Sequence, residues 1–116
     1  MDIETIRPYL LPAGIAAYLL FRHFRFKAAR GKLPGLAAEG AVFVDVRSPE
    51  EFAAGSRPGS LNIPLGALAA RAKELDKDKP VILCCASGAR SGIGAGILKG
   101  LGFRSVTNAG PWRNTL

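Results

Sequence analysis

The stretch Cys85-Ala86-Ser87-Gly88-Ala89-Arg90-Ser91 holds the residue types best suited to chemistry in this chain. This stretch begins at the last residue of the fully apolar run 81–85, which predicts a buried strand. Residues with helical spacing follow the stretch. In a short loop between a strand and a helix, backbone N–H groups point to the loop centre and the helix adds its partial positive charge. Such a loop lowers the pKa of a thiol, so Cys85 is the predicted nucleophile.

The other residues of this loop are expected to bind an anionic substrate. Hydroxyl groups on Ser87 and Ser91 can donate hydrogen bonds, Gly88 can take a positive φ, and Arg90 can add a cationic wall. The full predicted set is Ala86, Ser87, Gly88, Ala89, Arg90 and Ser91. Side chains alternate along a strand, so Cys84 is expected on the opposite face of the sheet, as a core residue. A role as resolving thiol is the alternative for Cys84.

Apolar runs and turn signals place this loop within an α/β domain. Strands are expected at 41–46, 61–63, 81–85 and 103–107, and helices after Ser48, over 64–75 and over 90–101. Ser48 is a predicted N-cap, with Pro49 in the first helical position and Glu51 three residues after the cap. Alternation of strands with helices predicts a mainly parallel sheet.

Charge is concentrated at the N-terminal end of the 116 residues, whose formal net charge is +7. Residues 1–32 hold six basic and two acidic residues, against ten and seven in residues 33–116. The second part is only mildly basic, and its charges mostly alternate in sign, so no nucleic-acid partner is expected. Two cysteines and one histidine are too few for a structural zinc site or a disulfide framework, so no metal is expected.

Residues 8–21 form an uncharged run between Arg7 and Arg22, and a basic cluster follows it. We expect residues 1–32 to be a hydrophobic helix with a basic flank that associates with a membrane, and residues 33–116 to be the domain. Fourteen helical residues reach about 21 Å, less than the roughly 30 Å of hydrocarbon, so a strained transmembrane helix and an interfacial helix both remain open. The basic flank places the domain on the cytoplasmic side. A soluble cytoplasmic protein whose helix packs on its own domain or on another chain is the alternative.

Several ordered motifs between residues 41 and 112 resemble the rhodanese-like domain, a family of sulfurtransferases. The segment Val44-Asp45-Val46-Arg47-Ser48-Pro49-Glu50-Glu51-Phe52 is similar to the first family signature, and Pro58-Gly59-Ser60-Leu61-Asn62-Ile63-Pro64-Leu65 to the second. The Cys85–Ser91 stretch looks like the active-site loop. Residues 102–108 look like the closing strand.

The resemblance implies a three-layer α/β domain that transfers sulfur without a metal or organic cofactor. Cys85 would take the outer sulfur of a donor such as thiosulfate as a persulfide, and a thiol or cyanide would accept it. Asp45, Arg47 and Glu51 would form a structural polar cluster beside the loop. Arg90 stands five positions after Cys85, whereas cysteine phosphatases have a loop one residue longer, so sulfur transfer is favoured over phosphate hydrolysis.

Two departures from the family pattern qualify this expectation. Ala86 stands where an arginine is frequent, and residues 108–112 stand where a Gly-Gly pair and a Trp-bearing helix are common. We expect the N-terminal segment or a second copy of the chain to cover the surface that such a helix would cover. A non-catalytic module that binds a partner at the membrane is the alternative function.

Overall fold

The apolar runs form the centre of a four-stranded sheet in the computed structural model, which describes residues 2–116. The strands are β1 (Val42–Asp45), β2 (Leu61–Asn62), β3 (Val81–Cys85) and β4 (Val106–Pro111). Their order is β2-β1-β3-β4, and every neighbouring pair is parallel. The prediction of an α/β fold with a mainly parallel sheet is therefore confirmed, and β3 ends at Cys85 as expected.

The last strand lies further along the chain than the sequence predicted. The prediction began it at Phe103, but β4 begins at Val106 and runs to Pro111. Phe103 is buried in the core, and its N–H donates to the carbonyl of Leu98. Residues 101–103 therefore terminate the helix that ends at Gly100 and do not pair in the sheet. A register shift between Leu83 and Cys84 then brings Gly110, rather than Ala109, opposite Cys84.

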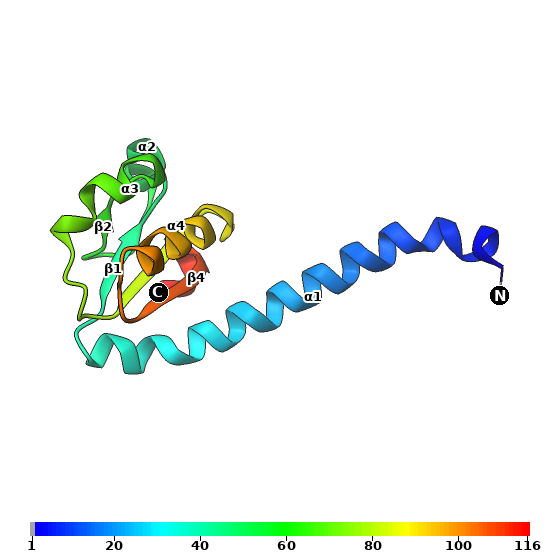
Figure 1. Ribbon diagram of the computed structural model, residues 1–116, viewed down its shortest axis with the longest axis horizontal. Coiled ribbons are helices and arrows are strands. Elements are labelled where there is room, and N and C mark those ends of the chain that lie inside the picture. Colours follow the sequence, from blue (N-terminus) through cyan, green and yellow to red (C-terminus); the bar gives the residue numbers. More distant parts are fainter. Residues whose placement is uncertain (1) are drawn as a thin grey trace.

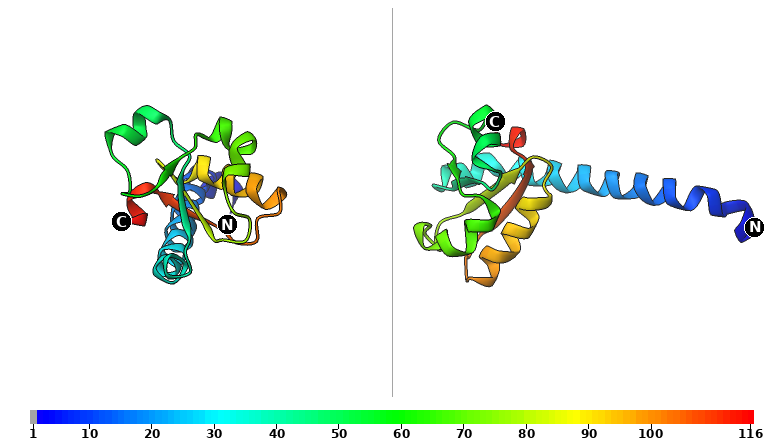
Figure 2. Two further views of the ribbon diagram at one scale, coloured as in Figure 1. Left: turned by 90° about the vertical axis from the view of Figure 1, so that its left-hand side faces the viewer. Right: turned by 90° about the horizontal axis from the view of Figure 1, so that it is seen from above.

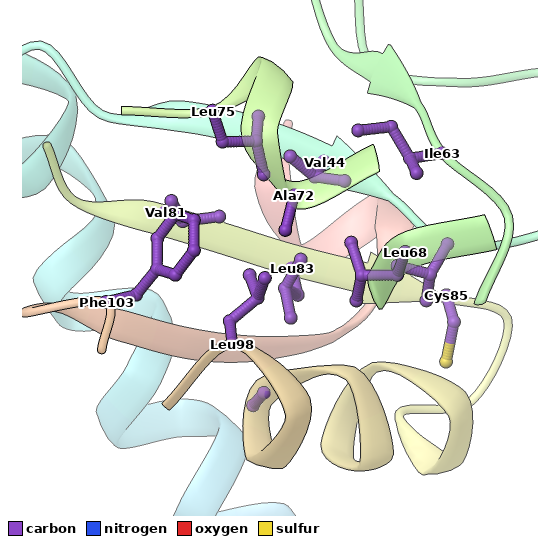
Figure 3. Close-up of a cluster of buried hydrophobic side chains, with 12 residues drawn as sticks. Val44, Ile63, Leu68, Ala72, Leu75, Val81, Leu83, Cys85, Leu98 and Phe103 are labelled. Carbon is purple, nitrogen blue, oxygen red and sulfur yellow. The ribbon is translucent and has the colours of Figure 1, made fainter. Parts of the chain in front are cut away.

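Helices cover both faces of the sheet and give three layers (Figure 1). The helices α3 (Leu65–Arg71) and α4 (Ala89–Gly100), with a 3-10 turn at Ala72–Glu74, pack on one face. Figure 3 shows the core between these helices and the sheet. Leu68, Leu83 and Leu98 are fully buried in it, and the Cys85 sulfur lies at one end. The short α2 (Pro49–Ala54) begins with the predicted capping box of Ser48 and Glu51.

The opposite face of the sheet is covered by the C-terminal half of α1 (Ile3–Ala38) and by the 3-10 turn Trp112–Thr115. Leu33 packs there with Ile82, Cys84 and Ala109, and Trp112 borders the same cluster. This face is therefore covered by the helix that contains the N-terminal segment, but its packed residues Leu33 and Leu36 lie just beyond residue 32, the limit expected for that segment. The helix continues past residue 32, where the N-terminal segment was expected to end, through Pro34 and Gly35 to Ala38.

The N-terminal half of α1 extends away from the sheet, so the molecule measures 56 × 29 × 28 Å (Figures 1 and 2). Within residues 2–116 no helix has both the length and the apolar character needed to cross a membrane. The expected transmembrane form of the N-terminal segment is therefore not supported. The physical reason is that the uncharged run 8–21 is short and Arg7 and Arg22 bound it.

Candidate active site

The Cys85 thiol lies at the end of β3, inside the loop that joins this strand to α4. Gly88 precedes α4 with φ +98°, a left-handed conformation that glycine adopts without strain. This turn directs the Gly88 N–H at the sulfur, with 2.9 Å between Gly88 N and Cys85 Sγ. The Ser91 hydroxyl lies 3.3 Å from the same sulfur, and Cys85 is fully buried. The loop therefore surrounds the sulfur with donors.

These donors make the Cys85 thiol more acidic than its burial alone would allow. Burial raises the pKa of Cys85, but hydrogen bonds from the Ser91 hydroxyl and from the backbone N–H groups of Ser91, Ser87 and Gly88 outweigh it. The pKa of Cys85 is consequently lowered from its ordinary value. This direction agrees with the prediction made from the loop.

Cys84 has the opposite character, although it is the adjacent residue. It packs in the cluster on the α1 face of the sheet, whereas Cys85 belongs to the cluster on the α4 face. Burial, reinforced by the charge of Asp45, raises the pKa of Cys84 to about 12. The prediction that the two side chains point to opposite faces, with Cys84 in the core, is confirmed.

Asn108, on β4, also holds the loop. Its amide nitrogen donates to the carbonyl of Gly88 over 3.1 Å, and its oxygen lies 2.6 Å from the Ser91 hydroxyl and accepts the N–H of Gly110 over 2.9 Å. Ser91 has one hydroxyl proton, so it can donate either to Asn108 or to Cys85. Sequence reasoning did not assign Asn108 a site role, because the irregular pairing of β4 is not visible in the sequence.

Arg90 does not stand free at the loop. Its guanidinium forms a two-point ion pair with Glu51, with Nη1–Oε1 and Nη2–Oε2 distances of 2.7 and 3.0 Å. The bonds from Arg90, and those from the backbone of Ser48, lower the pKa of Glu51 to about 2. Both side chains remain 38% exposed, so this pair ties α2 to α4 at the surface beside the loop.

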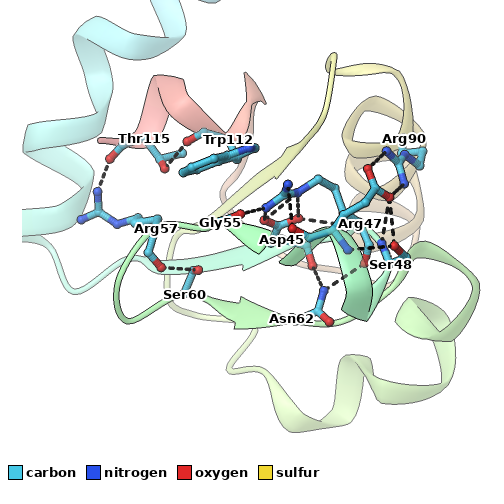
Figure 4. A network of polar contacts seen from close by, with 11 residues as sticks. Asp45, Arg47, Ser48, Gly55, Arg57, Ser60, Asn62, Arg90, Trp112 and Thr115 are labelled. Carbon is cyan, nitrogen blue, oxygen red and sulfur yellow. Dashed lines mark hydrogen bonds and ion pairs between the residues drawn. The ribbon is translucent and has the colours of Figure 1, made fainter. Parts of the chain in front are cut away.

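Asp45 and Arg47 form a second, buried pair (Figure 4). The two atoms Arg47 Nη2 and Asp45 Oδ2 are 2.7 Å apart, and Arg47 also donates to the carbonyl of Gly55 over 2.7 Å. Arg47 Nη1 reaches the backbone carbonyl of Glu51 over 3.3 Å, which connects the two pairs. The structure thus brings together the three residues expected as a polar cluster, with Glu51 directed to Arg90.

The rest of the predicted loop set faces outward. Ala86, Ser87 and Ala89 are exposed. The carbonyl of Ser87 accepts a hydrogen bond from Arg22 of α1, and the Phe26 ring packs so closely on Gly88 and Gly110 that neither could carry a Cβ without a clash. These two α1 residues were missed as neighbours of the site, because their basic and aromatic types are equally typical of a membrane flank.

Comparison with known proteins identifies relatives that contain the same domain. The family model described as the rhodanese-like domain matches residues 31–109. The thiosulfate sulfurtransferase GlpE of Pseudomonas syringae pv. syringae is 36% identical over 84 residues, which are 69% of this chain and 79% of that protein. A sulfurtransferase of Allochromatium vinosum is 37% identical over 70 residues, 60% of this chain and 65% of that protein. The matches span 40% and 54% of the length of two Bacillus subtilis relatives.

Solved structures give the same result for the fold. The human single-domain sulfurtransferase TSTD1 has a TM-score of 0.63 and 31% identity, covering 72% of this chain and 88% of that one. A rhodanese from E. coli, solved with anions, has a TM-score of 0.61 and 34% identity, covering 64% and 89%. Motifs, parallel sheet and loop all agree with these matches, and the chain belongs to the rhodanese-like domain family.

Proposed function

We propose that this chain is a sulfurtransferase that carries sulfane sulfur as a persulfide on Cys85. The observation that supports this most directly is the position of the Cys85 sulfur, 2.9 Å from the Gly88 nitrogen and 3.3 Å from the Ser91 hydroxyl. Donors fixed around a sulfur stabilise a thiolate before the reaction and a persulfide anion after it. Relatives named as thiosulfate sulfurtransferases support the same class of reaction.

With thiosulfate as donor, the Cys85 thiolate attacks the outer sulfur. The new bond joins Cys85 Sγ to that sulfur, the S–S bond of thiosulfate breaks, and its electron pair leaves with sulfite. In the second half of the cycle an acceptor such as cyanide or a thiolate attacks the sulfane sulfur. The electron pair of the broken bond returns to Cys85 Sγ, so no metal, oxidant or organic cofactor is needed.

The loop residues Ala86, Ser87, Gly88, Ala89, Arg90 and Ser91 are proposed to bind the donor and the persulfide, mainly through backbone N–H groups and the Ser91 hydroxyl. Asp45, Arg47 and Glu51 are proposed to hold the loop in place. The Arg90 guanidinium is already paired with the Glu51 carboxylate. We therefore propose that Arg90 contributes to anion binding while it shares its positive charge between Glu51 and the bound anion.

Sulfur transfer from thiosulfate to cyanide, measured as thiocyanate, tests this function. Wild type and Cys84→Ala are expected to turn over, because Cys84 packs on the opposite face of the sheet. Cys85→Ala is expected to lose turnover while keeping its fold. Equal activity in Cys85→Ala and wild type would refute the proposal, and an inactive wild type would favour a partner-binding module.

We further propose that the projecting half of α1 lies on the surface of a membrane, on its cytoplasmic side. Large apolar side chains are exposed along it, including Tyr9, Leu11 and Phe21, and five basic residues follow the uncharged run within residues 22–32. Co-sedimentation of the full chain with phosphatidylglycerol vesicles is expected, with less for phosphatidylcholine vesicles and for Leu11→Asp. A chain that stays in the supernatant with both vesicles would contradict it.

A further inference from the structure

A groove lies between α1 and the Cys85 loop, and its α1 wall has no part in the proposed reaction with thiosulfate. Its volume is about 700 Å³. One wall is the α1 segment 18–26, and the other is formed by the loop residues Ser87–Ala89 and the first turns of α4. We call it the α1 groove. The α1 residues that matter for its chemistry are Tyr18, Leu19, Arg22, Arg25 and Phe26, and Ile93 faces them from α4.

The groove adjoins the loop that holds the reactive sulfur. Gly88 lines it, and the N–H of the same residue donates to Cys85 Sγ over 2.9 Å. Arg22 donates to the carbonyl of Ser87, and Phe26 packs on Gly88, so two α1 side chains contact the loop directly. A molecule in the α1 groove therefore lies beside the loop around Cys85.

The walls of the groove combine positive charge with apolar surface. Arg22 and Arg25 line it, no acidic residue does, and within residues 2–116 no carboxylate lies within ion-pair distance of either arginine. Tyr18, Leu19 and Ile93 are all more than half exposed. Guanidinium groups bind carboxylates and phosphates, and exposed apolar walls gain free energy when an apolar chain covers them. This chemistry fits an anionic amphiphile.

We propose that the α1 groove binds the sulfur acceptor and selects a thiol that carries an anionic group on an extended apolar body. This inference rests on the proposed persulfide at Cys85. In the transfer step the acceptor thiolate attacks the outer sulfur of Cys85–S–SH and forms a new S–S bond. The bond between that sulfur and Sγ breaks, its electrons stay on Cys85 as thiolate, and the acceptor leaves as R–S–SH.

A comparison of three thiols on the sulfur-loaded protein tests the groove. Cys85 is first loaded with thiosulfate, excess donor is removed, and the second-order rate of sulfur loss is measured with mercaptooctanoate, mercaptopropionate and mercaptooctanol. Mercaptooctanoate is expected to react at least about tenfold faster than either of the others, because only it has both the chain and the charge. Failure to load would count against the proposed function; loading followed by equal rates would overturn only the groove.

Paired variants on α1 show whether the preference arises in the groove. Arg25→Gln is expected to remove the rate advantage of mercaptooctanoate over mercaptooctanol, which depends on the carboxylate. Leu19→Ser is expected to remove the rate advantage of mercaptooctanoate over mercaptopropionate, which depends on the apolar chain. Arg7→Gln and Leu11→Ser change the same residue types outside the groove and are expected to keep both advantages. Each thiol is compared between proteins, so its intrinsic reactivity cancels. If Arg25→Gln and Leu19→Ser keep both rate advantages of mercaptooctanoate, the proposal is overturned. It is also overturned if the wild-type chain forms a dimer that Leu19→Ser converts to monomer, because the groove would then bind a second copy of the chain.

Discussion

Two adjacent cysteines differ in chemistry because they face different surroundings. Cys84 meets apolar side chains and the negative charge of Asp45, so its pKa rises to about 12. Cys85 meets hydrogen-bond donors that more than offset its burial, so its pKa falls. The direction of each pKa shift is therefore decided by the groups that the thiol contacts rather than by burial alone.

Ser91→Ala removes the only side-chain donor to the Cys85 sulfur among residues 2–116. Alkylation needs the thiolate, so its rate rises as the pH passes the thiol pKa and then levels off. In a Cys84→Ala background, the midpoint of alkylation by iodoacetamide is expected to move to higher pH in Ser91→Ala. Ser60→Ala, far from the loop, is expected to leave it in place. An unmoved midpoint in Ser91→Ala would mean that the hydroxyl donates to Asn108 instead.

At this scale the sequence predicts which cysteine lies inside the loop and part of its surroundings. A strand end, a glycine and a helix start fix where backbone N–H groups point, so Cys85, Gly88 and Ser91 could be identified from local spacing. The partner of Arg90 could not, because Glu51 lies 39 residues earlier and the contact depends on how α2 packs against α4. Asn108 was missed for a similar reason, since it reaches the loop from the next strand.

The elements around the loop are held together by polar contacts between segments distant in sequence. Glu51 caps α2 through Ser48 and pairs with Arg90 at the start of α4, while Arg47 ties β1 to the end of α2. Strand β3 agrees with its predicted limits because five consecutive apolar residues are buried on both faces. The limits of β4 were wrong, because its irregular pairing and buried Phe103 are tertiary effects.

Glu51→Gln tests the link between α2 and α4 through its pH dependence. The pKa of Glu51 falls from 4.5 to about 2 on folding, so the pair stabilises the protein above the unfolded value and the effect disappears as the pH falls through the folded value. The difference in unfolding free energy between wild type and Glu51→Gln is expected to be constant above about pH 5 and to shrink toward about pH 2. Urea unfolding across this range measures it.

Glu50→Gln provides the control for that series. Glu50 neighbours Glu51 on α2 but makes no ion pair within the described residues. Its substitution is expected to give no such pH-dependent difference. A difference for Glu51→Gln that stays the same at every pH would contradict the ion pair as its cause.

At the scale of the whole molecule, α1 packs on the sheet and also contacts the Cys85 loop. Its C-terminal half covers one face of the sheet through Leu33 and Leu36, and its middle borders the Cys85 loop through Arg22 and Phe26. Composition and charge predicted a distinct N-terminal helix, but not where it would lie. An apolar and basic segment is equally consistent with a lipid surface and with a protein surface, and only the structure distinguishes the parts that pack on the sheet from those that project.

Leu33→Ala and Leu11→Ala make the same change in the two halves of α1. Leu33 is 6% exposed against the sheet, so its truncation is expected to lower the free energy of unfolding by about 2–5 kcal/mol. Leu11 is 73% exposed, and its truncation is expected to change the free energy of unfolding by less than about 0.5 kcal/mol. Urea unfolding of both variants measures this. Equal effects would mean that α1 does not pack on the sheet as described.

The central claim is that Cys85 alone carries the transferred sulfur, and mass spectrometry after thiosulfate treatment tests it most directly. The intact wild-type chain and Cys84→Ala are each expected to gain one sulfur atom, which cyanide then removes. Cys85→Ala is expected to gain none, because the raised pKa and apolar surroundings of Cys84 leave it without a thiolate. Sulfur retained in Cys85→Ala but lost in Cys84→Ala would contradict the assignment.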